Sequence, residues 1–240
     1  MSKEQEFNEE YEEEIVGEYE EDGVVSQIKK YGTILVVGLV AIVIGLYSYN
    51  YLNEQSEKEN AEATKHLVRI TPLLSQGEYE RALNGDPNII IDNEKLLGFK
   101  DIASKYSGTD AGNVAAFYAG KALIMMGNFS EAKNYFSTAM SNGANEIKLG
   151  AMNGMAACLE QEENYAEASK NHESAAGMVE QIEMKSKFLY FAGLTAEKAN
   201  DKDRAKTFYD KVVMMNAENA YSEFAGMSNS GLNRIGTKID

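Results

Sequence analysis

Proline is scarce in this sequence, since Pro72 and Pro87 are the only two among 240 residues. Proline interrupts a helix because its ring clashes with the preceding turn and because it lacks an N–H donor. Stretches rich in Ala, Glu, Lys, Met and Leu therefore run on without interruption, and these residue types favour helix. Runs with strand character, such as residues 88–91, are short and isolated. The composition predicts an all-α fold.

Cysteine and histidine are also scarce. Cys158 is the only cysteine, which excludes an intrachain disulfide and a cysteine-based metal site. The two histidines, His66 and His172, lie far apart in the sequence, and we interpret His172 as a packed side chain. The sequence contains no phosphate-binding loop, nucleophile elbow or paired metal-ligand motif. We therefore expect no enzymatic activity, no bound metal and no cofactor.

Basic residues are outnumbered, because 23 Lys and Arg stand against 38 Asp and Glu, for a net charge of −15. Binding to phosphates needs a basic face, so this balance excludes nucleic acid as a partner. Residues 1–30 alone hold eleven acidic residues against three lysines. Within them Phe7, Tyr11, Ile15 and Tyr19 lie four apart, and on a helix they would form a stripe for docking to a basic partner. We favour the alternative, a disordered and self-repelling acidic tail.

One long run, residues 31–53, carries no charge. As a helix it would be roughly 34 Å long, enough to cross a hydrocarbon core of about 30 Å. The run begins too late and is too long for a cleaved signal peptide, so we predict an uncleaved transmembrane helix. Lys29 and Lys30 precede it directly. By the positive-inside rule they predict a cytoplasmic N-terminus, with residues 54–240 on the other side of the membrane.

Beyond this run the sequence repeats itself. A helical series of large and small residues occurs three times, at shifts of 36 and 37 residues: Phe129, Ala132, Phe136 and Ala139; Tyr165, Ala168, His172 and Ala175; Lys202, Ala205, Tyr209 and Val212. A second predicted helix precedes each series and carries a small residue at a constant distance: Gly120, Ala156 and Gly193. A period of this length, built from pairs of helices, indicates an α-solenoid.

These series resemble the tetratricopeptide repeat over residues 113–218. The resemblance implies a solenoid of about three to four helix pairs. His172 and Lys202 depart from the pattern, because large apolar residues are usual at both positions, and the usual late proline is missing from every unit. The expected organisation is an acidic cytoplasmic tail, a transmembrane helix, a membrane-proximal helical region and a repeat domain, at residues 1–30, 31–53, 54–112 and 113–240.

Two further segments complete this prediction. Residues 77–83 resemble a fourth, degenerate repeat within the membrane-proximal region, displaced by the Gly-Asp-Pro insertion near residues 84–88. Residues 221–235 are expected to form a closing cap helix at the C-terminal end of the solenoid.

Tetratricopeptide repeats bind partners on their concave face, which the first helix of each pair lines. The resemblance and a count round these helices predict the following groove residues: Val114, Phe117, Lys121, Met125, Asn153, Ala157, Glu160, Lys187, Tyr190, Leu194 and Lys198. The groove would be apolar at one end and mixed, with lysines, at the other. The alternative is that these are unrelated surface residues.

The whole layout is similar to the YfgM-like family of bacterial inner-membrane proteins, with the closest likeness at residues 99–136. The resemblance implies a single-pass protein with its repeat domain in the periplasm. It would be an ancillary translocon subunit that acts with a membrane-anchored periplasmic chaperone on exported client chains. Two alternatives remain open. One is a scaffold in envelope assembly or cell division, and the other is a regulatory anchor whose acidic tail binds a cytoplasmic protein. The oligomeric state is not predicted.

Overall fold

The computed structural model describes residues 23–219 and 222–236. The predicted docking stripe of the acidic tail lies outside these residues. The chain divides into two compact units, Met1–Gln55 and Ser56–Asp240, which are described separately below. About 79% of the structure is helical, so the all-α prediction is confirmed apart from one small two-stranded sheet.

The first unit contains most of the long helix α2, which runs from Gly23 to Ser75. Among the described residues, α2 is the one helix long and apolar enough to cross a membrane. Its most apolar 18-residue window has a mean hydropathy of 2.1, and none of this window is buried. The core helix of a soluble protein would bury such a surface, because exposed apolar area in water is unfavourable.

The second unit begins with the last turns of α2, which lead through α3 (Tyr79–Asn84) into a β-hairpin. Strands β1 (Gly85–Ile91) and β2 (Glu94–Leu97) pair antiparallel around Asp92 and Asn93. These two residues have φ angles of 52° and 64°, as a type I′ turn requires. The prediction that residues 88–91 are an isolated run was therefore wrong, since they pair with β2.

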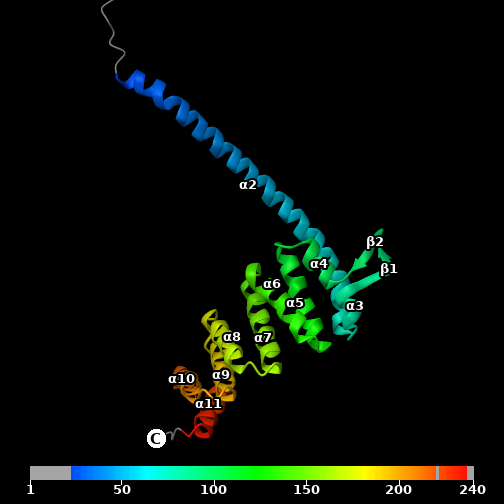
Figure 1. Cartoon of the computed structure of the whole chain (residues 1–240), viewed down its shortest axis with the longest axis vertical. Coiled ribbons are helices and arrows are strands. Elements are labelled where there is room, and N and C mark those ends of the chain that lie inside the picture. Colours follow the sequence, from blue (N-terminus) through cyan, green and yellow to red (C-terminus); the bar gives the residue numbers. More distant parts are fainter. Residues whose placement is uncertain (1–22, 220–221, 237–240) are drawn as a thin grey trace, which may run out of the picture. The chain divides into compact units, whose positions relative to one another are not determined.

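Three pairs of helices follow the short helix α4 (Phe99–Lys105). The pairs are α5 (Asp110–Met125) with α6 (Phe129–Asn142), α7 (Asn145–Gln161) with α8 (Tyr165–Gly177), and α9 (Ile182–Lys198) with α10 (Lys202–Met215). A last helix, α11 (Glu223–Arg234), packs against α9 and α10 as the predicted cap. Each helix packs against the next, so the repeat-like solenoid is confirmed (Figure 1).

One ring from the second helix of each pair packs between the first helix of that pair and a later helix, and we call Phe136, His172 and Tyr209 the packing rings. A Cβ added to Gly120 of α5 would lie 2.7 Å from the ring of Phe136, and one added to Gly154 of α7 would lie 2.4 Å from it. Glycine is therefore required on both sides of this ring. Tyr209 packs in the same way against glycines of α9 and α11.

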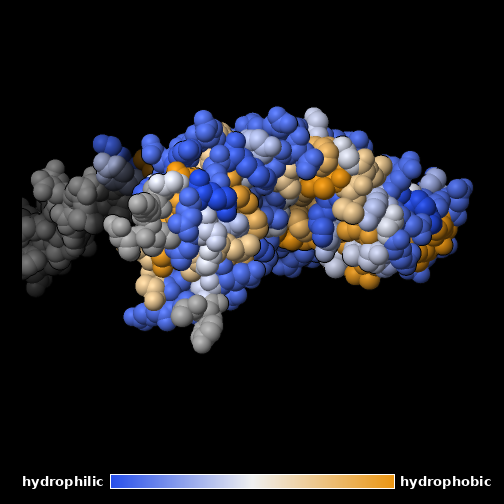
Figure 2. All heavy atoms as spheres, turned by 90° about the horizontal axis from the view of Figure 1, so that it is seen from below, coloured by the Kyte–Doolittle hydropathy of each residue, from blue (hydrophilic) through white to orange (hydrophobic). Residues whose placement is uncertain are grey.

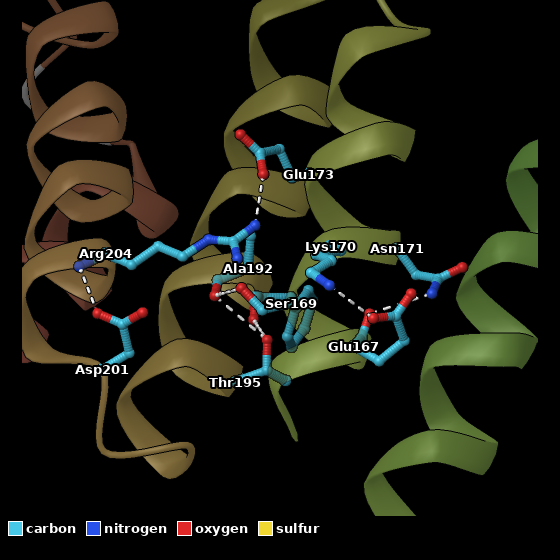
Figure 3. Close-up of polar contacts among 10 residues, drawn as sticks. Glu167, Ser169, Lys170, Asn171, Glu173, Ala192, Thr195, Asp201 and Arg204 are labelled. Carbon is cyan, nitrogen blue, oxygen red and sulfur yellow. Dashed lines mark hydrogen bonds and ion pairs between the residues drawn. The ribbon is translucent and has the colours of Figure 1, made fainter. Parts of the chain in front are cut away.

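The apolar core is divided near α7 and α8, where Ala156, Leu159 and Ala168 form a small cluster apart from the two larger ones. Polar contacts add to the apolar packing between the following helices (Figure 3). The buried hydroxyl of Ser169 donates to the Ala192 carbonyl at 2.8 Å, which ties α8 to α9. Arg204 on α10 donates to Glu173 on α8 at 2.6 Å. The middle of the solenoid is thus held partly by hydrogen bonds and ion pairs.

Candidate functional site

A groove of about 330 Å³ opens between the first helices of two successive repeats, α5 and α7. Its lining residues come from α5, α6 and α7: Phe117, Lys121, Ile124, Met125, Phe136, Gly150, Asn153, Gly154 and Ala157. Five of them, namely Phe117, Lys121, Met125, Asn153 and Ala157, are among the predicted groove residues. We call this site the α5–α7 groove.

Two aromatic rings form the inner wall of the α5–α7 groove. The ring centroids of Phe117 and Phe136 are 6.2 Å apart and the rings are tilted, as aromatic pairs prefer. Both rings lie close to the backbone of α7, because Gly150 and Gly154 carry no side chain there. A Cβ at Gly150 would come within 2.9 Å of the Phe117 ring. The two glycines therefore create the space that the rings occupy.

Lys121 is the one charged side chain among the lining residues. Its ammonium lies 5.5 Å from the ring centroid of Phe117 and 5.6 Å from that of Tyr118. These distances allow a cation–π interaction, which holds the charge over the aromatic surface. The groove thus presents an apolar wall with a positive charge beside it.

Met125 forms the outer edge of the groove and is 59% exposed. Methionine is unbranched and polarisable, so it adapts to partners of different shape. In the space-filling view, hydrophobic residues gather in separate patches between hydrophilic ones (Figure 2). A surface of this kind can bind apolar side chains of another protein without burying charge.

The remaining predicted residues lie outside this groove. Val114 and Leu194 are half-buried at the edges of the two main core clusters. Lys187 is exposed on α9. Lys198 donates to Glu160 at 2.8 Å, so these two predicted residues form an ion pair between α9 and α7.

Tyr190 was expected on the open face, but it is only 7% exposed. Its ring centroid lies 6.0 Å from those of Tyr209 and Phe224. Phe224 belongs to the cap helix α11, which covers this part of α9. Tyr190 therefore packs in the core beneath the cap, and it offers little surface to a partner.

Three kinds of lining residue were missed at the sequence level. Phe136 was predicted as a member of the repeat series and not as a groove residue; it is fully buried, yet it is among the residues that line the groove. Gly150 and Gly154 carry no side chain, so a search for binding residues passed over them. Ile124 directly precedes Met125, and a prediction that included a wider apolar face of α5 would have contained it.

The side chains that line the α5–α7 groove are suited to binding. Lys121 is the only titratable side chain that lines the groove. The nearby thiol of Cys158 is buried, and burial raises its pKa to about 11. A thiol with so high a pKa is almost fully protonated at neutral pH and is a poor nucleophile. The Cys158 thiol therefore fits a packing role.

The fold and the groove define the chain as a helical-repeat protein with an interaction surface. A family model described as a tetratricopeptide repeat-like domain matches residues 27–181, which is more than half of the chain. The chain belongs to the tetratricopeptide repeat-like family, whose domains are typically non-enzymatic modules for protein–protein interaction. No curated protein and no solved structure matches the chain.

Proposed function

We propose that this chain is a membrane-anchored, non-enzymatic interaction protein that binds a protein partner in the α5–α7 groove. The observation that carries the proposal is the groove itself, where the rings of Phe117 and Phe136, the flexible edge of Met125 and the charge of Lys121 meet. Aromatic side chains next to a polar rim are the usual anchors of protein interfaces. A partner segment with an apolar side chain and a neighbouring carboxylate complements this arrangement.

The apolar part of α2 is the proposed anchor. Its exposed apolar side chains and its length fit a single crossing of the bacterial inner membrane. Lys29 and Lys30 support a cytoplasmic N-terminus, which would place residues 54–240 in the periplasm. The groove would then face newly exported chains rather than cytoplasmic proteins.

The partner class follows from this location and from the likeness to the YfgM-like family. We infer an ancillary subunit of the translocon that works with a membrane-anchored periplasmic chaperone and contacts exported client chains. Extended client segments expose apolar side chains before they fold, and a groove with a flexible methionine edge can accept many of them.

Site-specific crosslinking tests the proposal. A photoreactive residue replaces Met125 in the full-length chain, in membranes with active export. A matched variant carries the same residue at Val68, which is 70% exposed on α2 and lies outside the groove. We expect crosslinks to translocon subunits, the chaperone or exported chains from position 125, and far fewer from position 68, because a photoreactive side chain crosslinks only what it contacts.

Two outcomes would contradict the proposal. Equal crosslinking from both positions would mean that the groove does not select a partner. Crosslinks only to cytoplasmic proteins would reverse the orientation and with it the periplasmic role. Lys121→Glu is a further control, because reversing the rim charge should weaken crosslinking from position 125 without changing the fold.

A further inference from the structure

A cluster of three possible metal ligands joins α2 to the β-hairpin, away from the α5–α7 groove. Glu62 and His66 lie one turn apart on α2, at positions i and i+4, and Glu94 begins β2. Side chains four residues apart on a helix lie on the same face. The ligand atoms of all three residues lie within 4.8 Å of one another.

His66 provides a second and independent observation. The residue is only 2% exposed, and neither Nδ1 nor Nε2 has a hydrogen-bond partner. The nearest acceptor on the hairpin, Oε2 of Glu94, is 3.9 Å from Nε2, which is too far for a hydrogen bond. A buried polar atom without a partner costs roughly 1–3 kcal/mol, so such atoms call for an explanation.

The orientation of the His66 ring suits a metal ligand. Its face stacks on Tyr106, with the ring centroids 5.9 Å apart, which fixes the direction of the ring. An imidazole held in one orientation, with no hydrogen bond at either nitrogen, can direct a ring nitrogen at a cation.

Two basic side chains bind the same carboxylates and decide which cation fits. Arg69 donates to Oε2 of Glu94 at 3.1 Å, and it also pairs with Asp92. Lys105 donates to Oε1 of Glu62 at 3.3 Å. These contacts hold the carboxylates in place and offset most of their charge. Calcium and magnesium rely on carboxylate charge and oxygen ligands, so they gain little here, whereas imidazole favours zinc and similar metals.

We propose that Glu62, His66 and Glu94 form a binding site for a divalent transition metal, of which Zn²⁺ is the best fit. In tetrahedral zinc sites the ligands lie about 2.0–2.2 Å from the metal, so the ligand atoms are about 3.3 Å apart. The ligand atoms need to approach one another by up to about 1.5 Å, and both carboxylates are partly exposed, so their side chains have room for this shift. A water molecule completes the fourth position. The metal joins α2 to β2 and thereby fixes the hairpin on the helix.

The other buried histidine supplies a matched comparison. His172 also has two unpartnered ring nitrogens, but the one carboxylate beside it is Glu160, at 3.7 Å, and Lys198 binds the other oxygen of Glu160. In the part of the chain that the structure describes, the Glu62, His66 and Glu94 group is the one that meets the geometric requirement for three ligands. His172 therefore lacks the ligand set that a zinc site needs.

Zinc titration of the metal-stripped, full-length chain in detergent micelles tests the proposal by calorimetry. We expect one Zn²⁺ per chain, unchanged binding in His172→Gln, and an affinity at least about tenfold lower in His66→Gln. Glu94→Gln removes a partly exposed ligand, so it reports on the site even if the His66 variant folds poorly. Lys105→Gln should bind zinc more tightly than the wild type, because it removes a competing cation from Glu62.

Two results would overturn the inference. One is an absence of stoichiometric zinc binding by the wild-type chain. The other is equal zinc affinity in the wild type and in Glu94→Gln, with helical content unchanged by circular dichroism. Neither result affects the groove proposal, because the two sites share no residue.

Discussion

The first and the middle helix pairs fill the same space between helices with different side chains. In the α5–α6 pair the large ring of Phe136 lies between two glycines, Gly120 and Gly154. In the α7–α8 pair the smaller ring of His172 takes the equivalent position, and Ala156 stands where the first pair has Gly120. Phe191 of α9 lies next to this ring, with centroids 5.6 Å apart. The ring and the residues around it vary together, so that the volume between the helices stays filled.

The two pairs also differ in the kind of contact that their side chains make. In the first pair the packing ring is apolar, and Phe117 and Met125 of α5 line the α5–α7 groove together with residues of α7. The middle pair has a polar ring and a small apolar cluster, and it is connected to α9 and α10 through Ser169, Glu160 and Glu173. The apolar side chains of the first pair thus line an open groove, whereas polar contacts add to the apolar packing between the middle pair and the helices that follow it.

The largest effect is expected from Phe136→Ala. The side chain is fully buried, and its removal leaves a cavity between α5 and α7, so unfolding should require roughly 3–5 kcal/mol less free energy. Denaturant unfolding of the full-length chain in detergent micelles, followed by circular dichroism, measures this change. His172→Ala is the matched variant and should cost less, because its ring is smaller and carries unpartnered nitrogens. An equal or larger loss in His172→Ala would remove the distinction between the two pairs.

A moderate effect is expected from Gly120→Ala. The added Cβ would lie 2.7 Å from the Phe136 ring, which must shift, and overpacking of this kind costs about 1–3 kcal/mol. The control is Gly226→Ala on α11, where an added Cβ meets nothing within 4 Å. Alanine favours helix over glycine by up to about 1 kcal/mol, so the control should be stabilised. The prediction fails if both variants shift the thermal midpoint in the same direction.

The smallest effect concerns pH and the polar ring of the middle pair. Burial lowers the pKa of His172 below its ordinary value of 6.5, with Glu160 acting in the opposite direction. The unfolded chain therefore binds the proton first as pH falls, and the stability of the folded chain should decline below about pH 6.5. Each such histidine contributes at most about 1.4 kcal/mol per pH unit.

His172→Leu tests this expectation by removing the titrating ring. Its unfolding free energy should depend less on pH between 6.5 and 5 than that of the wild type, and the remaining dependence includes His66, whose pKa burial also lowers. Identical pH profiles for the two proteins would show that folding does not lower the pKa of His172, contrary to this prediction.

Much of the solenoid could be predicted from the spacing of residues, because each packing ring recurs with a small residue at a fixed distance upstream. The hairpin could not be predicted in this way. Its turn is formed by Asp92 and Asn93, a less common type I′ pair than Asn-Gly, and it interrupts an otherwise helical segment. The flanking isoleucines, residues 89–91, were the available signal.

The α5–α7 groove was predicted in part, for a reason that Tyr190 makes clear. A count round one helix gives the direction of a side chain and takes no account of the helices that cover it. Met125 is exposed and Phe117 is half-buried where they line the groove, whereas Tyr190 lies beneath Phe224 of the cap. The sequence did not bring the three proposed metal ligands together, because Glu94 is distant in sequence from Glu62 and His66.

The ring of Tyr209 packs against a glycine of α9 and a glycine of the cap helix α11, and this arrangement would allow the number of repeats to change. A duplicated unit of about 36 residues, inserted ahead of α11, would bring its own ring and its own small residue. The incoming ring would meet Gly231 of the cap just as Tyr209 does now. Gene duplication could therefore lengthen the protein by whole units while both of its ends stay unaltered.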